Sequence, residues 1–273
     1  MTICAYATSA GADDDEIAPV LAAWREVGIE GRAERWDDPG VDWSAYDAVV
    51  IRSVWDYVPR REEFLAWARG AESVTRLLNS RAVLESNTDK TYLRDLDVPT
   101  VPTHWSSRGL PDWPEYVVKP AVSAGGRDTT RTTDRAEAQT LAAALEAAGR
   151  TPMVQPYLDM VESEGETSLL YFNGRFSHAV RRNPVLAPVL DTGQAAGEPP
   201  RVHTRTPAPD QVELAEKVLV AVPHVLLYAR IDLVRLPGGG PAVIEVELTE
   251  PYLFLNQEPE AAARFARALR ELL

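Results

Sequence analysis

Hydrophobic and polar positions in the first part of the chain predict strands that alternate with helices. Residues 2–8, TICAYAT, and 47–53, DAVVIRS, are short apolar runs of the kind that form buried strands. Residues 15–28 and 61–72 carry apolar side chains at helical spacing. Because alternating strands and helices form parallel sheets covered on both faces, residues 1–85 are predicted to be an α/β domain.

The pattern changes in the middle of the chain to that of a small α+β lobe, which we assign to residues 86–160. Residues 116–118 and 152–158 predict two strands. Between them, residues 134–149 predict an alanine-rich helix that ends at Gly149, a residue suited to the left-handed conformation after a helix.

The remaining residues, 161–273, are predicted to form a second α+β lobe. FNGR at 172–175 is a tight-turn signal between two strand patterns and predicts a hairpin. A second hairpin is expected from 229–248, with helices at 210–222 and 258–272. Six prolines between Pro184 and Pro209 predict a long connecting loop.

Composition narrows the class of protein. The chain has 273 residues, of which 45% are hydrophobic and 25% charged, and a formal net charge of -13. This charge argues against a nucleic-acid partner, whose phosphates require clustered positive charge. Cys4 is the single cysteine and cannot form an internal disulfide. No run is long enough to span a membrane, and no basic leader precedes DDDE at 13–16, so we expect a cytoplasmic protein.

Lysine is scarce in this chain. Only Lys90, Lys119 and Lys217 occur, whereas arginine supplies the other 25 of the 28 basic residues. An ammonium group is a compact point charge that a guanidinium does not replace in every phosphate site. Coding bias alone explains Lys217, which is expected on the exposed face of a helix.

The other two lysines occupy positions where an anion is expected. Lys119 ends an apolar strand and precedes a loop with Gly125 and Gly126, so its charge requires an anion, a carboxylate or access to water. Lys90 is predicted in the first turn of a helix capped by Asn87 or Thr88, where its charge opposes the helix dipole. A bound anion would relieve this conflict.

The second hairpin carries three acids in alternation with aliphatic residues, so Ile244 and Val246 are expected on one face of its second strand and the acids on the other. If the outer faces of its two strands coincide, Asp232, Glu245 and Glu247 converge, and Mg²⁺ or Mn²⁺ would relieve their repulsion. A solvated strand face is an equally good interpretation of this stretch alone. Arg230 beside the first acid offers a second contact to phosphate and favours the metal site.

The turn RSVWDY at 52–57 follows a predicted parallel strand, where ligands of such sheets bind. Trp55 and Tyr57 fit either packing or ligand binding. Arg52 and Asp56 could contact a ligand or pair with each other. Walker, dinucleotide-binding and kinase signatures are absent from the chain, which leaves another nucleotide-binding scaffold.

Five motifs occur in an order and spacing that resemble the ATP-grasp superfamily. They are NTDK (87–90), VVKPAVSAGG (117–126), VQPYL (154–158), EGETS (164–168) and ARIDLV with VIEVE (229–247). The resemblance covers essentially the whole chain. It implies the ATP-grasp fold, an N-terminal α/β domain followed by two α+β lobes that clamp ATP.

The resemblance also implies roles for individual residues. Lys90 and Lys119 would contact ATP phosphates, and the loop with Ser123, Gly125 and Gly126 would close over them. Gln155, Tyr157 and Leu158 would contact adenine. Glu166 would contact ribose, with Glu162 and Glu164 as competing candidates. Asp232, Glu245 and Glu247 would bind Mg²⁺. Many family members carry asparagine at the position of Glu247.

RSVWDY, FSHAVRR (176–182) and EVELTEP (245–251) narrow the likeness to ligases that resemble the O-ureido-serine cyclo-ligase of cycloserine formation. This implies an ADP-forming ligase that activates a carboxylate of an amino-acid derivative and forms an amide-type bond, either by cyclisation or by intermolecular ligation. The implied catalytic residues are Arg230 and Arg181, and the implied substrate contacts are Arg52, Ser53, Trp55, Asp56, Tyr57 and Glu250.

Three interpretations stay open on the sequence. The partner could be a small amino-acid-like substrate, a peptide or a carrier protein, or the fold could bind nucleotide without catalysis. A homodimer is possible. His178 could act as a base, although a lone strand histidine is more often a hydrogen-bonded structural residue.

Overall fold

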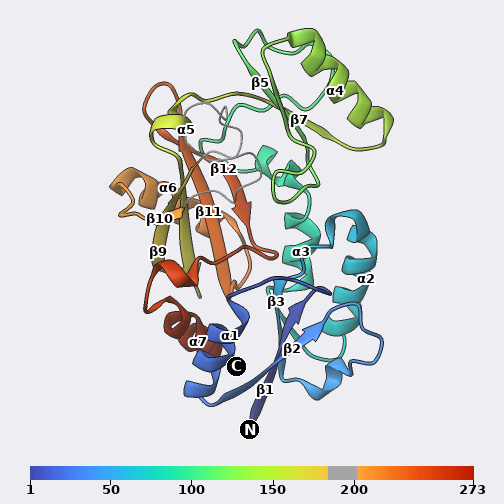
Figure 1. The fold of residues 1–273 in the computed structure, drawn as a ribbon, viewed down its shortest axis with the longest axis vertical. Helices are drawn as coiled ribbons and strands as arrows, with labels where there is room; N and C mark the ends of the chain where they lie inside the picture. The colour runs from blue at the N-terminus through green and yellow to red at the C-terminus, as the bar shows by residue number, and fades with distance from the viewer. Residues whose placement is uncertain (184–201) are drawn as a thin grey trace.

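The computed structural model describes residues 1–183 and 202–273, and its strands form three separate sheets (Figure 1). Most of the predicted proline-rich connector therefore lies outside the described residues. No helix in the described part of the chain is both long and apolar enough to cross a lipid bilayer.

The N-terminal sheet contains four parallel strands in the order β2-β1-β3-β4. They are β1 (Thr2–Thr8), β2 (Ile29–Arg35), β3 (Ala48–Ser53) and β4 (Arg76–Leu78). The helices beside them are α1 (Ile17–Glu26), α2 (Arg61–Glu72) and, from the end of the chain, α7 (Ala261–Leu272). Cys4 and Tyr6 pack with α1 and α7, whereas Ala5 and Ala7 pack with α2. Helices therefore cover both faces, as expected for a parallel sheet.

The central sheet is small and antiparallel, with the strand order β6-β5-β7. Its elements are β5 (Tyr116–Pro120), β6 (Thr130–Thr132), α4 (Arg135–Ala147) and β7 (Pro152–Pro156). Ala138 and Ala142 of α4 pack on Tyr116, Val118 and Val154. Asp134 caps α4 by accepting from the amide of Ala136, and Gly149 ends the helix region at a φ of +70°.

The C-terminal sheet is antiparallel and has the order β10-β9-β8-β11-β12. Its strands are β8 (Glu166–Phe172), β9 (Arg175–Arg182), β10 (Val202–Thr204), β11 (Tyr228–Arg235) and β12 (Pro241–Glu247). Asn173 and Gly174 both have positive φ, which confirms the tight turn predicted from FNGR. One face packs on α6 (Pro209–Ala221) through Leu214, Ala215 and Val218.

Short elements connect these sheets. They are α3 (Arg81–Asn87), α5 (Met160–Ser163) and the 3₁₀ turns Trp43–Ala45, Val58–Arg60, Lys90–Arg94 and Leu255–Gln257. The structure corrects the cap predicted before Lys90: Asn87 and Thr88 end α3, and Asp89 instead caps the following turn by accepting from the amide of Thr91. Lys90 is the first residue of that turn.

Candidate active site

The second face of the C-terminal sheet is apolar at one end and charged at the other. Leu170, Phe172 and Val180 pack in the core shared with α1 and α7. Further along the same strands the register brings Glu166 opposite Arg182 and Ser168 opposite Asp232. The sheet thus anchors one end of its face in the core and presents ionisable side chains at the other.

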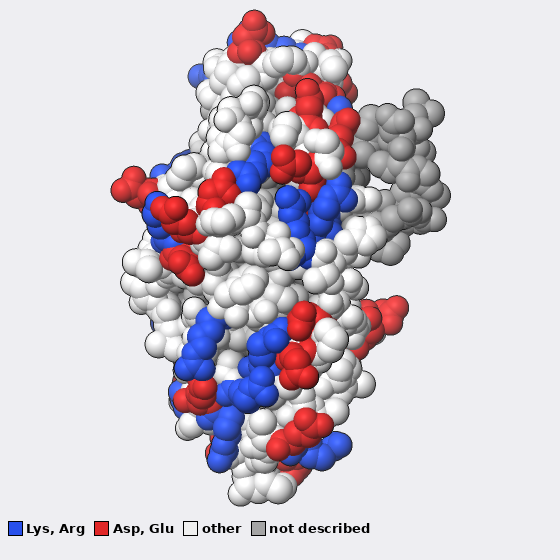
Figure 2. All heavy atoms as spheres, turned by 90° about the vertical axis from the view of Figure 1, so that its left-hand side faces the viewer, with Lys and Arg blue, Asp and Glu red and all other residues white. Residues whose placement is uncertain are grey.

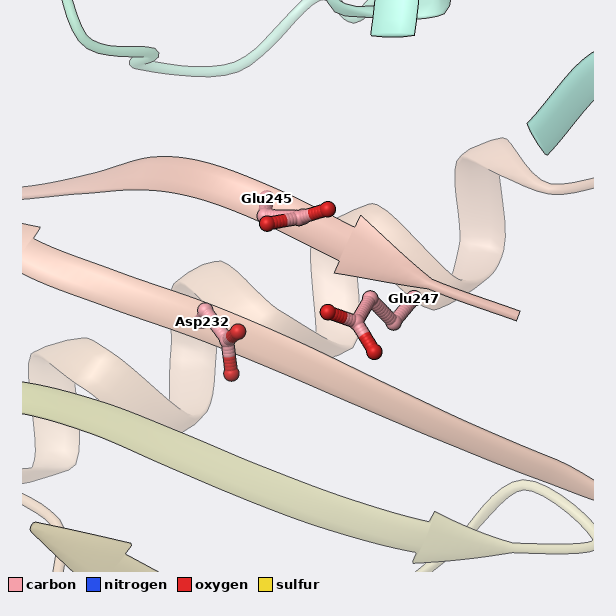
Figure 3. A group of neighbouring side chains, drawn as sticks. All are labelled: Asp232, Glu245 and Glu247. Atoms are coloured by element: carbon pink, nitrogen blue, oxygen red, sulfur yellow. The ribbon is translucent and has the colours of Figure 1, made fainter. Parts of the chain in front are cut away.

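Three acids of the β11–β12 hairpin converge at this charged end (Figure 3). Asp232, Glu245 and Glu247 each have a carboxylate oxygen within 4.8 Å of the others. Asp232 pairs directly with Glu245 in the ladder. A β-bulge follows this pair, and it corrects the expected strand face: Ile244 packs with Val234, on a different side from Val246.

Two guanidinium groups contact the buried Asp232. Arg182 Nη2 lies 2.6 Å from Asp232 Oδ2 and 2.7 Å from Glu166. Arg230 donates to both oxygens of Asp232 at 3.0 Å and to Glu247 at 2.5 Å. Burial alone would raise the pKa of Asp232, but Arg182 and Arg230 outweigh burial and hold it below its ordinary value.

Arg182 was not among the residues predicted for the site. It lies at the acid cluster, where Arg181 was expected. Arg181 lies on the opposite face of β9 and donates to the carbonyl groups of Ser163 and Glu164. Gly165 permits this packing, since a Cβ there would lie 2.5 Å from the Arg182 carbonyl oxygen. Strand alternation was the available signal, because Arg182 shares its face with Val180.

The pKa values of Glu247 and Glu250 are raised. For Glu247, burial and the charges of Glu245 and Asp232 overcome Arg230 and raise the pKa to about 7. For Glu250, burial and then the charge of Glu247 raise the pKa well above its ordinary value. Glu250 has no hydrogen-bond or ion-pair partner within residues 1–183 and 202–273. Glu250 is therefore a buried carboxyl group without a counter-ion in this part of the chain.

The two lysines differ in their partners. Lys90 is buried, lies 3.1 Å from Glu245 and donates to the Ser123 carbonyl oxygen. Burial would lower the pKa of Lys90, but Glu245 raises it above its ordinary value. Burial and the nearby Lys90 lower the pKa of Lys119, for which the described chain supplies no hydrogen-bond or ion-pair partner. Gly125 and Gly126 in the following loop have positive φ, which glycine adopts without strain.

The predicted adenine segment borders an apolar cluster. Leu158 packs with Val101 and Val234, and Tyr157 and Ile244 lie against them. The Gln155 side chain donates to Thr103 at 2.8 Å. This cluster lies between the central sheet, which supplies Gln155, and the β11–β12 hairpin.

Glu166 is the one of the three ribose candidates that contacts the charged end of the sheet, through Arg182. Glu162 instead accepts from the Tyr157 hydroxyl at 2.9 Å. Glu164 lies 3.7 Å from both Arg205 and Arg235.

A pocket opens beside the acids and combines residues from all three parts of the chain. Its lining residues are Tyr57, Asn87, Lys90, Ser123, Ala124, Glu245, Glu247, Thr249 and Glu250. The structure therefore brings Tyr57 and Glu250, two of the predicted substrate contacts, to the same pocket as Lys90.

The other predicted substrate residues lie outside this lining. Arg52 is buried against Glu16 at 2.9 Å, not against Asp56, which accepts from Trp36 and Arg60. Ser53 donates to Thr8, and Trp55 is half-buried away from the lining residues. Arg52 and Ser53 face inward because all six residues of β3 are buried.

His178 also lies away from the pocket. Its Nε2 donates to the Leu253 carbonyl oxygen at 3.0 Å, and its ring lies against Phe172. Burial lowers its pKa below the ordinary histidine value. This environment is that of a structural histidine.

Comparison with known proteins identifies the family. Residues 3–79 match the family described as D-cycloserine synthetase DcsG, N-terminal domain. The chain is 36% identical to the cycloserine biosynthesis protein DcsG of Streptomyces lavendulae, over 95% of this chain and 94% of that protein. This chain belongs to the D-cycloserine synthetase family of ATP-grasp ligases. Its expected ATP-grasp fold is confirmed.

Solved structures agree with this membership. The crystal structure of D-cycloserine synthetase DcsG matches with a TM-score of 0.88 and 34% identity, over 99% of both chains. The ATP-grasp ligase PsnB, complexed with minimal precursor, Mg and ADP, matches with a TM-score of 0.65 and 18% identity, over 98% of this chain and 96% of that one. The second match shows the shared fold alone. The protein is an ATP-dependent, amide-forming ligase of this family.

Proposed function

We propose that this ATP-grasp ligase uses ATP to phosphorylate the carboxylate of a small amino-acid derivative. The γ-phosphoryl group passes to a carboxylate oxygen and ADP leaves. A nitrogen of the substrate then attacks the acyl carbon, the C–N bond forms, and orthophosphate and a proton are released. The acid cluster and Lys119, which has no hydrogen-bond or ion-pair partner among the described residues, carry this proposal, because together they match a metal-bound polyphosphate.

The side chains fit the nucleotide and the metal by their chemistry. Asp232, Glu245 and Glu247 supply the hard oxygen ligands that Mg²⁺ or Mn²⁺ prefers. Lys119 offers an unpaired ammonium group to phosphate. The apolar cluster around Leu158 suits an adenine ring, and Glu166 suits a ribose hydroxyl. A bound Mg²⁺ would neutralise charge on the phosphate oxygens.

Arginine side chains of this chain stabilise the charge that develops on the transferred group. Arg230 and Arg182 already lie at the acid cluster, within hydrogen-bond distance of Asp232. We assign Arg230 the role predicted for it and give Arg182 the role predicted for Arg181. Phosphoryl transfer needs such positioning and charge neutralisation, and no protein nucleophile.

The pocket suits a substrate with a protonated amino group. Glu250 is a buried carboxylate without a partner among the described residues, and an ammonium ion would neutralise it. Tyr57 borders the same space. Because the relative at 36% identity is a cycloserine biosynthesis protein, we propose that the attacking nitrogen belongs to the same molecule and that the bond closes a ring.

The reaction is tested by measuring product release across a panel of amino acids and their O- and N-substituted derivatives. We expect ADP and orthophosphate in equal amounts, and a hydroxamate when hydroxylamine is present, because hydroxylamine traps an acyl phosphate. AMP with pyrophosphate would rule out the acyl-phosphate route. Turnover confined to peptides or carrier proteins would identify the alternative ligase, and the absence of turnover with any acceptor would identify a nucleotide-binding protein.

The raised pKa of Glu247 predicts how metal affinity depends on pH. Below about pH 7 the folded protein holds a proton on Glu247, which a metal ion must displace. Apparent Mg²⁺ affinity should therefore fall by up to about tenfold per pH unit below this value, by the linkage of one proton. Mg²⁺ titrations at several pH values measure this dependence, and Glu247→Gln should remove it.

A further inference from the structure

The segment from Thr249 to Leu255 leads away from β12 and carries Glu250 into the pocket. It forms no helix or strand before the short 3₁₀ turn at its end. A buried backbone without regular hydrogen bonds needs other partners for its amides and carbonyls. Side chains from distant parts of the chain supply these hydrogen-bond partners. They hold the segment in place although it belongs to no helix or sheet.

Two buried residues of the N-terminal domain contact this segment from one side. Glu16 accepts from the amides of Leu253 and Leu255 at 3.1 and 2.8 Å. Arg52 donates to the Pro251 carbonyl oxygen at 2.9 Å. Glu16 and Arg52 are 0% and 2% exposed, and they pair with each other at 2.9 Å. The ion pair therefore holds three backbone groups that follow Glu250.

The opposite side of the segment contacts the C-terminal sheet. Arg230 donates to the Tyr252 carbonyl oxygen at 3.2 Å, and His178 donates to that of Leu253. Phe254 has a φ of 53°, a left-handed conformation that persists only where surrounding contacts hold it. Arg230, which we assigned above to the transferred phosphate, thus contacts the same segment as Glu16 and Arg52.

The Arg52 guanidinium is also enclosed by aromatic rings. It lies 5.3 Å from the ring centre of Tyr228 and 5.9 Å from that of Phe265. The Tyr228 hydroxyl lies 2.9 Å from the Thr249 carbonyl oxygen. Arg52 is not among the residues that line the pocket, and its contacts are with the backbone that follows Glu250.

We propose that Glu16 and Arg52 are positioning residues for the amino-acid substrate, an inference that rests on the ligase function proposed above. Their ion pair fixes the 249–255 segment, so that Glu250 meets the substrate's amino group and Arg230 keeps its place at the acid cluster. The sequence predicted that Arg52 contacts the substrate. We infer that Arg52 acts instead through the 249–255 segment.

The test compares three variants with wild type. Glu16→Met with Arg52→Met removes both charges and the three backbone contacts, while avoiding an unpaired buried charge. Asp15→Asn is a milder variant, because Asp15 holds Asn256 at 2.8 Å and the Tyr252 hydroxyl from the exposed side. Leu65→Ala is the stability control, since Leu65 is buried in α2 in a cluster that contains no residue of the 249–255 segment.

We expect the double variant to raise KM for the amino-acid derivative and to lower kcat/KM for it about 100-fold, as a misplacement near 1 Å can. KM for ATP should stay at the wild-type value. Lys119 and Leu158 lie far from this segment in the sequence, and the Leu158 cluster contains none of its residues. Hydrogen exchange at 250–257 should accelerate in the double variant and less in Asp15→Asn. Leu65→Ala should lower the melting temperature and leave the KM for ATP and the KM for the amino-acid derivative at their wild-type values.

Unchanged kinetics in a folded double variant would overturn the positioning role. An equal rise of both KM values in the double variant, matched by Leu65→Ala at the same loss of melting temperature, would also overturn it. Failure of the wild-type protein to turn over ATP with any acceptor is a different result, which refutes the proposed function itself. A double variant that does not fold leaves the decision to Asp15→Asn, where the absence of both faster exchange and a higher substrate KM contradicts the inference.

Discussion

We expect Lys119→Ala to lower kcat/KM for ATP by about 30- to 1,000-fold, which corresponds to about 2–4 kcal/mol of lost transition-state stabilisation. Lys119 is half-buried, and the described chain provides no hydrogen-bond or ion-pair partner for its ammonium group. Burial lowers its pKa, so the charged form opposes folding. A group retained at such a cost to stability is explained by a ligand that carries the opposite charge.

The same reasoning separates function from stability in this variant. Removing a half-buried charge that has no partner among the described residues relieves desolvation, so the melting temperature of Lys119→Ala should equal or exceed that of wild type. The matched control is Lys217→Ala, because Lys217 is exposed and pairs only with Glu213, four residues before it on α6. Initial rates against ATP concentration, with melting curves for both variants, measure the two effects. Near-normal turnover in folded Lys119→Ala protein would refute the phosphate contact.

Local patterns in the sequence indicated the acid cluster on one hairpin as one of two equally good interpretations. Alternation along β11 and β12 places Asp232 and Glu245 side by side, because side chains two residues apart share a face. The same rule failed at Ile244, because a β-bulge turns this side chain to the other face of the strand. No residue type in the stretch indicates that bulge. Register between strands depends on the whole sheet, so such shifts lie beyond local pattern.

Two strands of the N-terminal sheet escaped prediction for a related reason. β2 (Ile29–Arg35) has one fully buried side chain, Ile29, because it lies at the sheet edge. β4 (Arg76–Leu78) spans only three residues, too few to show a period. Their pairing with β1 and β3 supplies the stability that their own composition does not indicate.

Arg52 shows why a charged residue at a strand end does not always face a ligand. Its partner Glu16 lies 36 residues earlier in the chain, and its second contact, Pro251, lies 199 residues later. Neither contact can be found from local spacing. Arg182 was missed because its neighbour Arg181 has the same residue type. Strand alternation puts the two on opposite faces, and the register with Glu166 shows which face meets the acids.

The second large effect is expected from Glu245→Gln. Glu245 is a member of the acid cluster and also the ion-pair partner of Lys90 at 3.1 Å. Its neutralisation removes one hard oxygen ligand and leaves Lys90 buried without a carboxylate. Since partners that only touch metal ligands contribute about 10- to 100-fold to affinity or activity, loss of a ligand should lower metal-dependent activity by at least about 100-fold.

Two measurements decide this prediction. Activity should rise with Mg²⁺ or Mn²⁺ concentration in the wild-type protein and vanish in excess chelator, whereas Glu245→Gln should need much more metal or stay inactive at saturation. Glu213→Gln is the control, because Glu213 is an exposed glutamate whose ion pair with Lys217 lies on α6. Full wild-type activity in excess chelator would refute the assignment of a metal ion to this site. A metal-dependent wild type with an unaffected Glu245→Gln would instead confine the ligands to Asp232 and Glu247, because these carboxylates alone would then supply the oxygen atoms.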